Sequence, residues 1–75
     1  MKDLLEFIAK SLVDNKEAVS VTEIEKEDSI TLELRVDEGD MGKVIGKQGR
    51  IAKAIRTVIR SASSKTGKKV IVDII

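Results

Sequence analysis

The sequence predicts one α+β domain in which helices pack on one face of a three-stranded sheet, in the element order α-β-β-α-α-β. Two observations carry this prediction. Apolar residues recur at three- and four-residue spacing in two long segments and alternate with polar residues in two shorter ones. The chain has 75 residues, the size of one small domain, and contains no internal repeat and no low-complexity linker. We therefore expect residues 1–75 to form a single domain.

The first predicted element is a helix over residues 3–13. Its apolar stripe follows helical spacing and comprises Leu5, Ile8, Ala9 and Leu12, with Leu4 and Phe7 at the margin. Asp3 is the expected N-cap of this helix. Phe7 is the only aromatic residue of the chain, and we expect its side chain to lie in the core.

Two strands are predicted to follow and to pair as a hairpin. Over residues 18–25, Val19 and Val21 alternate with polar neighbours, and Ile24 falls out of step, which indicates a bulge or a twist near the strand end. Over residues 29–36 the alternation is strict, and the apolar face consists of Ile30, Leu32, Leu34 and Val36. Such a hairpin has one face packed on the core and one face in water.

The second half of the chain predicts two helices and a last strand. A short helix is expected over residues 41–45, with Asp40 as its N-cap. A longer helix follows over residues 50–63, then a loop to residue 69 and a β-branched run over residues 70–75, which is typical of a buried strand. The spacing within the longer helix predicts three core residues: Ile55, Val58 and Ile59.

The charges are segregated along the chain. Residues 1–40 hold twelve acidic and five basic residues, whereas residues 41–69 hold nine basic residues and no acidic one. A positive segment attracts polyanions, and the acidic remainder of a chain with net charge +1 limits indiscriminate binding. The segregation favours a nucleic-acid partner. The alternative is a basic helix that is simply solvated.

The tetrapeptide Gly46-Lys47-Gln48-Gly49 is the motif with the clearest functional meaning. Glycine tolerates positive φ and lets a ligand backbone come close, and a two-residue turn between helices requires both. The spacing alone is weak evidence, because Gly-x-x-Gly arises by chance in roughly a third of chains this long, and residues 39–42 repeat it. The copy at residues 46–49 is stronger evidence than the spacing alone, because it lies between two predicted helices and all charged residues around it are basic. It matches neither a P-loop nor a dinucleotide fingerprint.

Residues 44–50, Val-Ile-Gly-Lys-Gln-Gly-Arg, resemble the KH signature, an Ile-Gly-x-x-Gly loop between two helices. The resemblance covers essentially the whole chain and is greatest to the small stand-alone bacterial KH proteins of the KhpA type, which have the type II KH fold. One departure is Ala52, where many KH domains carry a bulky aliphatic residue. The resemblance implies a protein that binds about four nucleotides of single-stranded RNA, as a post-transcriptional regulator or RNA chaperone. It also implies self-association and pairing with a larger KH-containing RNA-binding partner.

The residues around the loop also predict how it would hold RNA. The backbone N–H groups at the glycines, the start of the following helix and the Lys47 ammonium group all favour a phosphate close by. Aliphatic side chains beside the loop offer bases an apolar edge, and the basic helix adds attraction for any polyanion. The candidate RNA-binding residues are Lys43, Val44, Ile45, Gly46, Lys47, Gln48, Gly49, Arg50, Ile51 and Lys53.

The composition excludes several classes of function. Without cysteine or histidine the chain lacks disulfides, thiolate nucleophiles, the usual zinc ligands and the commonest general base, so we expect neither an enzyme nor a cofactor. Without tryptophan or tyrosine it lacks the stacking platforms of many RNA-binding domains. No apolar run approaches the roughly 18 residues of a membrane span, and we expect a cytoplasmic protein.

Protein partners are the remaining possibility. A basic helix could dock an acidic protein, with RNA contact incidental. Self-association is expected as well, because part of the second helix is neither basic nor bulky and would let another helix come close. We expect a weak homodimer through the helices next to the loop, with the same surface able to accept a related KH partner. The small residues behind this expectation are Ala52, Thr57 and Ala62.

Overall fold

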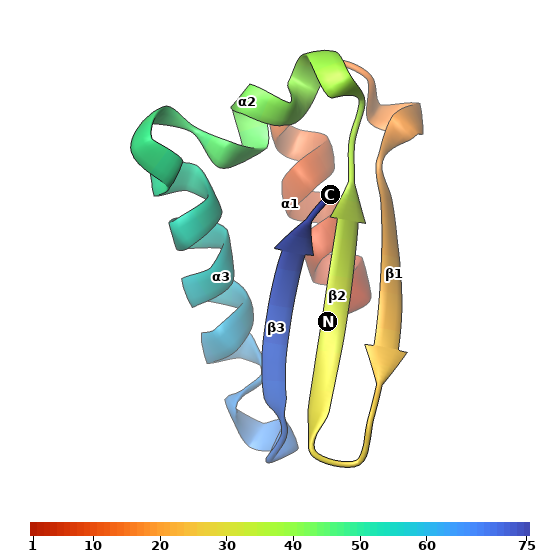
Figure 1. Cartoon of the computed structure of the whole chain (residues 1–75), viewed down its shortest axis with the longest axis vertical. Coiled ribbons are helices and arrows are strands. Elements are labelled where there is room, and N and C mark those ends of the chain that lie inside the picture. Colours follow the sequence, from red (N-terminus) through yellow and green to blue (C-terminus); the bar gives the residue numbers. More distant parts are fainter.

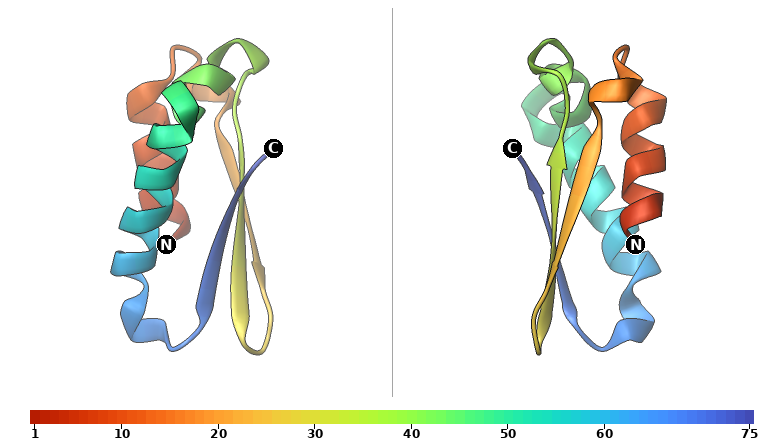
Figure 2. Two further views of the ribbon diagram at one scale, coloured as in Figure 1. Left: turned by 60° about the vertical axis from the view of Figure 1, so that its left-hand side comes forward. Right: turned by 90° about the vertical axis from the view of Figure 1, so that its right-hand side faces the viewer.

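The computed structural model describes all 75 residues and shows two layers, with the helices on one face of a sheet (Figure 1, Figure 2). The helices are α1 (Lys2–Leu12), α2 (Met41–Ile45) and α3 (Arg50–Ala62), and the strands are β1 (Ser20–Glu25), β2 (Ser29–Arg35) and β3 (Lys69–Ile74). The predicted α+β class, the element order and the type II KH arrangement are confirmed. Observed and predicted element ends differ by at most two residues.

β2 is the central strand of the sheet, whose order is β1-β2-β3. It pairs antiparallel with β1, as the predicted hairpin requires, and parallel with β3, which the chain reaches through α2 and α3. The β1 register is continuous from residue 20 to residue 25, which excludes a bulge, one of the two alternatives expected there. Ile24 is out of step because it points to the open face of the sheet, where its side chain is exposed.

The core lies between the sheet and the two long helices. The largest fully buried side chains come from four different elements and are Leu5, Leu32, Leu34, Val44 and Ile59. β3 buries only Val72 completely, while Ile71 and Ile75 are exposed. The final strand is therefore buried on one face only, where Val70, Val72 and Ile74 pack on the core, because the second face of the sheet has no covering layer (Figure 2).

Three predictions about the helices are wrong. Phe7 is 70% exposed and Val58 is 47% exposed, although both were expected in the core. The sheet has only three strands, and the side chains of Leu5 and Ala9 on α1 and of Ile55 and Ile59 on α3 cover it. Phe7 and Val58 point away from the sheet and lie outside the core. Asp3 lies in the first turn of α1 and does not cap it, because the helix begins one residue earlier with Met1 at the N-cap position.

Candidate nucleic-acid interface

The glycine loop joins α2 to α3 at a corner of the molecule (Figure 1). α2 ends at Ile45, and the N–H of the following Gly46 donates to the Gly42 carbonyl oxygen over 2.8 Å. The loop then reverses with positive φ at Gly46 (75°), Gln48 (58°) and Gly49 (73°), and α3 begins at Arg50. Positive φ at three of four consecutive residues is why the turn needs its glycines.

The two glycines meet different constraints. A Cβ on Gly46 would lie 2.5 Å from Cγ1 of Ile51 and 2.8 Å from its Cβ, so the start of α3 packs directly on the bare backbone. Its ψ of 175° with φ of 75° is a conformation that is essentially restricted to glycine. A Cβ on Gly49 would meet no atom within 4 Å. Gly46 is thus needed for packing and backbone shape, and Gly49 for backbone shape alone.

Lys47 and Gln48 form the tip of the loop. Both side chains are exposed, and neither forms a hydrogen bond or a salt bridge within the chain. Because the fold makes no use of them, they are free to contact a ligand. The structure thus places the predicted loop residues together at the surface, with Arg50 at the first position of α3.

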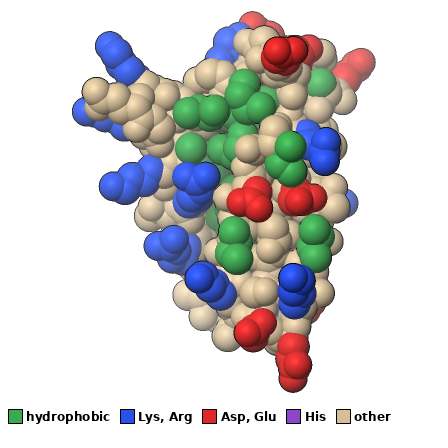
Figure 3. Space-filling model, in the orientation of Figure 1, with side chains coloured by type: hydrophobic (Ala, Val, Ile, Leu, Met, Phe, Trp, Pro, Cys, Tyr) green, Lys and Arg blue, Asp and Glu red, His purple; other side chains and the backbone are tan.

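A row of cationic side chains continues from the loop along α3. Arg50, Lys53, Arg56 and Arg60 are all exposed, and none forms a salt bridge, since the chain's four ion pairs use only Lys10, Lys43 and Lys68 as cations. Figure 3 shows blue side chains along the α3 side of the molecule, beside apolar and acidic side chains on the sheet. An unpaired row of this kind attracts a polyanion without losing internal ion pairs.

Two predicted contact residues are not available to RNA in the expected way. Val44 is completely buried in the core, so it supports α2 and cannot touch a base. Lys43 forms salt bridges with Asp14 and, over 3.2 Å, with Asp40, so two carboxylates already balance its charge. Ile45, 37% exposed, and the half-buried Ile51 remain as the apolar edge beside the loop.

Ala52 also lies differently from the expectation. It is 4% exposed, so the idea of an exposed small-residue face around it is wrong. The helical turn after the loop packs this residue inward, because Ala52 and Ile55 share the buried side of α3. Thr57 and Ala62, the other two small residues behind the expectation, are exposed.

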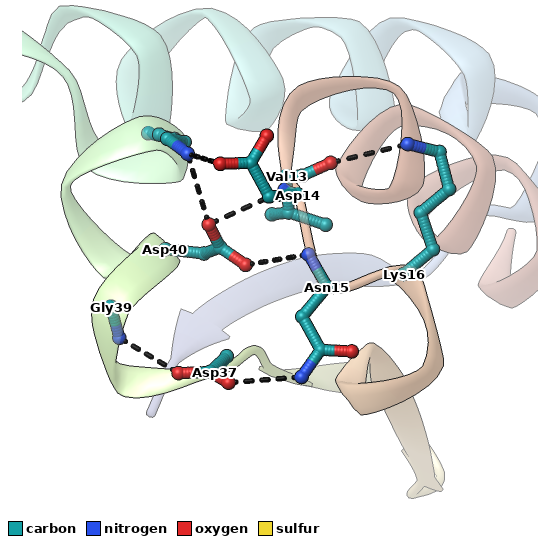
Figure 4. A network of polar contacts seen from close by, with 8 residues as sticks. Val13, Asp14, Asn15, Lys16, Asp37, Gly39 and Asp40 are labelled. Carbon is teal, nitrogen blue, oxygen red and sulfur yellow. Dashed lines mark hydrogen bonds and ion pairs between the residues drawn. The ribbon is translucent and has the colours of Figure 1, made fainter.

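A polar network fixes α2 to the end of α1 (Figure 4). Asp40 is 4% exposed and holds the predicted N-cap position of α2, but its carboxylate makes no capping hydrogen bond to the backbone of that helix. It accepts hydrogen bonds from the backbone N–H groups of Asn15 (3.0 Å) and Asp14 (3.3 Å) and from the Lys43 ammonium group. Asp37 accepts from the Asn15 side chain (2.9 Å) and from Gly39 N–H (2.9 Å).

Hydrogen bonds in this network stabilise its charged groups. The Asn15 N–H is the main cause that lowers the pKa of the Asp40 carboxyl, and the Asn15 side chain lowers the pKa of Asp37. The pKa of Lys43 is raised, first by its hydrogen bond to Asp14 and then by its hydrogen bond to Asp40. Both acids and the lysine therefore stay charged at neutral pH, and the network sets the position from which α2 presents the glycine loop.

Arg56 is not among the predicted site residues, yet the structure places it in the basic row. Its Nε–H donates to the Val72 carbonyl oxygen over 3.3 Å, which joins α3 to β3. Helical spacing would have indicated it, since residues 53, 56 and 60 fall on one side of a helix. The sequence therefore indicates the position of Arg56 on the basic side of α3, but it does not indicate the hydrogen bond to Val72 on β3.

Comparison with known proteins agrees with this geometry. The family model described as "KhpA/KhpB, KH domain" matches residues 2–74. The chain is 65% identical to the RNA-binding protein KhpA of Clostridium perfringens over the full length of both. It is 55% identical to the RNA-binding protein KhpA of Aquifex aeolicus, over all of this chain and 95% of that protein. A third relative, the RNA-binding protein KhpA of Borreliella burgdorferi, is 49% identical over 97% of this chain and 89% of its own length.

No solved structure gives a significant match to the chain. With 13 residues in the longest helix, none of the helices could span a membrane. The family model covers the glycine loop, the basic helix and all three strands together. The chain belongs to the KhpA/KhpB KH-domain family.

Proposed function

We propose that this chain is a non-enzymatic, single-domain protein that binds single-stranded RNA through the Gly46–Gly49 loop and the basic row of α3. One observation carries the proposal: the tip side chains of the glycine loop are exposed and form no hydrogen bond or salt bridge, and a row of unpaired cations begins next to them. The relatives named as RNA-binding proteins support it. A role as a post-transcriptional regulator or RNA chaperone fits a module with a short footprint and little means of base selection.

The strand would run from the loop along the outer side of α3. Backbone N–H groups near the two glycines and the Lys47 ammonium group would hold a phosphate at the loop. Ile45 and Ile51 would offer the next base an apolar edge, and Arg50 and Lys53 would attract the following phosphates. One such footprint binds weakly, so paired sites on one RNA would raise the affinity.

Crosslinking tests this proposal against docking of an acidic protein by the same helix. Ultraviolet irradiation of the full chain with a radiolabelled single-stranded RNA, followed by mass spectrometry, should place adducts at Lys47, Gln48 and the adjoining turn of α3. A matched sample with a polyglutamate peptide in excess shows whether any polyanion competes equally. Adducts scattered over Lys2, Lys16 and other cations remote from the loop would refute the loop as the binding site.

The groove between α1 and α3 is a candidate surface for self-association. It encloses about 500 Å³ between mainly hydrophobic walls, which include Leu4, Phe7, Ile51 and Val58. Phe7 and Val58 are the two most exposed large hydrophobic residues of the chain. The groove lies on the α1 side of α3, whereas Arg56 contacts β3, so a partner in the groove would leave Arg56 open to RNA and would share Arg50 and Ile51 with the proposed RNA site.

We propose a second copy of the chain as the occupant, with a related KH domain as the heterologous alternative partner. Charge complementarity supports a twofold arrangement. Arg50 lies at the loop end of the groove, and Asp3 borders Phe7 near the other end, beside Glu6, which is paired with Lys10 over 2.9 Å. Two copies facing each other with their α1 helices antiparallel would bring Arg50 of each towards the acidic start of the other, as an isologous interface requires.

Phe7→Glu should raise the dissociation constant of the homodimer at least tenfold, because it removes the largest apolar side chain of the groove and places a charge there. Sedimentation equilibrium over a concentration series measures the dissociation constant. Ile24→Glu on the open sheet face is the matched control, since Ile24 is exposed and lies outside the groove. A parent chain that stays monomeric to high micromolar concentration, or an equal loss with Ile24→Glu, would rule this interface out.

A further inference from the structure

The open face of the sheet carries its side chains in regular rows. Ile30, Leu32 and Leu34 of β2 point into the core, so the residues between them, with their partners on β1 and β3, point to the open face. The middle row is uncharged, crosses all three strands and consists of Ile24, Thr31 and Ile71. Both isoleucines are exposed, so a mainly apolar strip lies in water at the centre of this face.

The rows on the two sides of this strip have opposite charge. The acidic row consists of Thr22, Glu33 and Asp73. On the other side Ser29 pairs with Lys69, and the N–H of Lys26 donates to the Ser29 carbonyl oxygen over 2.7 Å, so the two lysines form a basic row. None of the four charged side chains forms a salt bridge within the chain. Red, green and blue side chains follow one another down the sheet in Figure 3.

This pattern is complementary to itself. Neighbouring rows are about 6.7 Å apart, because they are two residues apart along each strand. A twofold axis parallel to the apolar row would lay that row on the same row of a second copy, and each acidic row on the basic row of the other copy. Asp73 of each copy would then face Lys69 of the other. Two sheets pack face to face in this way when their strands are nearly aligned.

The remaining charges of the face favour the same arrangement. Glu33 and Asp73 are direct partners on neighbouring strands, and like charges in that position destabilise a sheet unless cations approach them. Arg35 lies one row beyond the acids and would come over the hairpin turn of the second copy, which carries Glu27 and Asp28. A twofold axis parallel to the strands would instead lay acids on acids, so only one orientation is complementary.

We propose that the open face of the sheet is a second surface for self-association, occupied by the same face of another copy in this antiparallel, twofold arrangement. The α1–α3 groove belongs to the helix layer on the other face of the sheet (Figure 2). The three strands cover only about 14 by 20 Å, which is small beside the roughly 800 Å² per partner of a standard interface. The contact is therefore weaker than the groove dimer and joins such dimers at higher concentration.

The contact leaves the glycine loop and the basic row of α3 uncovered. None of the loop and α3 residues of the proposed RNA site lies on the open face. Two copies joined by their sheets would therefore offer two footprints to one RNA, which raises the affinity without new contacts. This consequence rests on the proposed function, whereas the contact between the sheets does not.

Charge reversal tests the contact in the Phe7→Glu background, in which the groove does not contribute. Asp73→Lys would place cation against cation twice in each dimer, and Lys69→Asp would place acid against acid. Each change alone should raise the dissociation constant, measured by sedimentation equilibrium, roughly tenfold or more. An equimolar mixture of the two variants should recover the parent affinity to within about threefold, because each contact then joins a cation of one chain to an acid of the other.

The matched control is the pair Lys2→Asp and Glu17→Lys in the same background. These changes shift the net charge by the same amounts at exposed positions outside the sheet. Neither should change the dissociation constant, and their mixture should associate no more tightly than either chain alone. A gain in the control mixture equal to that of the Asp73→Lys and Lys69→Asp mixture would show attraction by net charge alone and would overturn the proposal.

Dilution of the Phe7→Glu chain maps the contact without any reversed charge. The amide resonances of Ile24, Thr31 and Ile71 should shift most in nuclear magnetic resonance spectra recorded from millimolar to low micromolar concentration. The proposal fails if this chain stays monomeric at millimolar concentration, if the shifts are confined to the helices, or if the folded charge-reversed variants do not recover association when mixed.

Discussion

Replacing Lys47 and Gln48 together by Asp is expected to reduce RNA affinity at least 100-fold and to leave the fold intact. The substitution puts two negative charges where the loop would hold a phosphate, and like charges in contact cost several kcal/mol of binding free energy. The fold should persist because both side chains are exposed and unpaired. The positive φ of Gln48, 58°, suits Asp better than most residues.

The measurement is anisotropy with a single-stranded RNA, together with thermal unfolding followed by circular dichroism. The control must change the net charge by the same three units at a distance from the loop. Lys2→Asp with Ser20→Asp does so at two exposed positions, and Ser20 stands opposite Arg35, which favours an acid there. If the folded loop variant bound RNA as the parent does, or if the control lost as much affinity, the loop would not be the phosphate site.

Replacing Gly46 by Ala is expected to destabilise the domain by about 3 kcal/mol or more. The backbone conformation at this position costs a residue with a side chain about 1–3 kcal/mol, and forcing a methyl group against Ile51 adds about 1–3 kcal/mol. A domain of this size has a free energy of unfolding of roughly 4–11 kcal/mol. The melting temperature should therefore fall by about 12–24 °C.

Gly49→Ala is the matched control, within the same motif. Gly49 also has a positive φ, 73°, but a Cβ there would contact nothing within 4 Å. The Gly49→Ala substitution should lower the free energy of unfolding by only about 1–2 kcal/mol, which is the cost of the left-handed backbone conformation. Differential scanning calorimetry of the two variants measures the difference. Equal melting temperatures would show that the close approach of Ile51 relaxes without cost, and that packing does not explain the first glycine.

Local sequence determined the elements and the loop. Apolar spacing of two residues predicted β2, and spacing of three and four residues predicted α1 and α3, because each periodicity follows from the geometry of the backbone alone. The turn between α2 and α3 was predictable for the same kind of reason, since the glycines at 46 and 49 supply positive φ within a four-residue segment. Lys47 and Gln48 then had to lie at its tip.

Only the tertiary structure decided how far each buried face extends and which distant groups meet. Periodicity shows where a helical face points, but the neighbouring elements set its width, so Phe7 and Val58 are exposed and Ala52 is buried. Lys43 meets Asp14 from 29 positions away, and Arg56 meets Val72 from 16 positions away. Contacts of that separation depend on how α1, α2 and β3 pack in space, and no spacing rule along the chain encodes them.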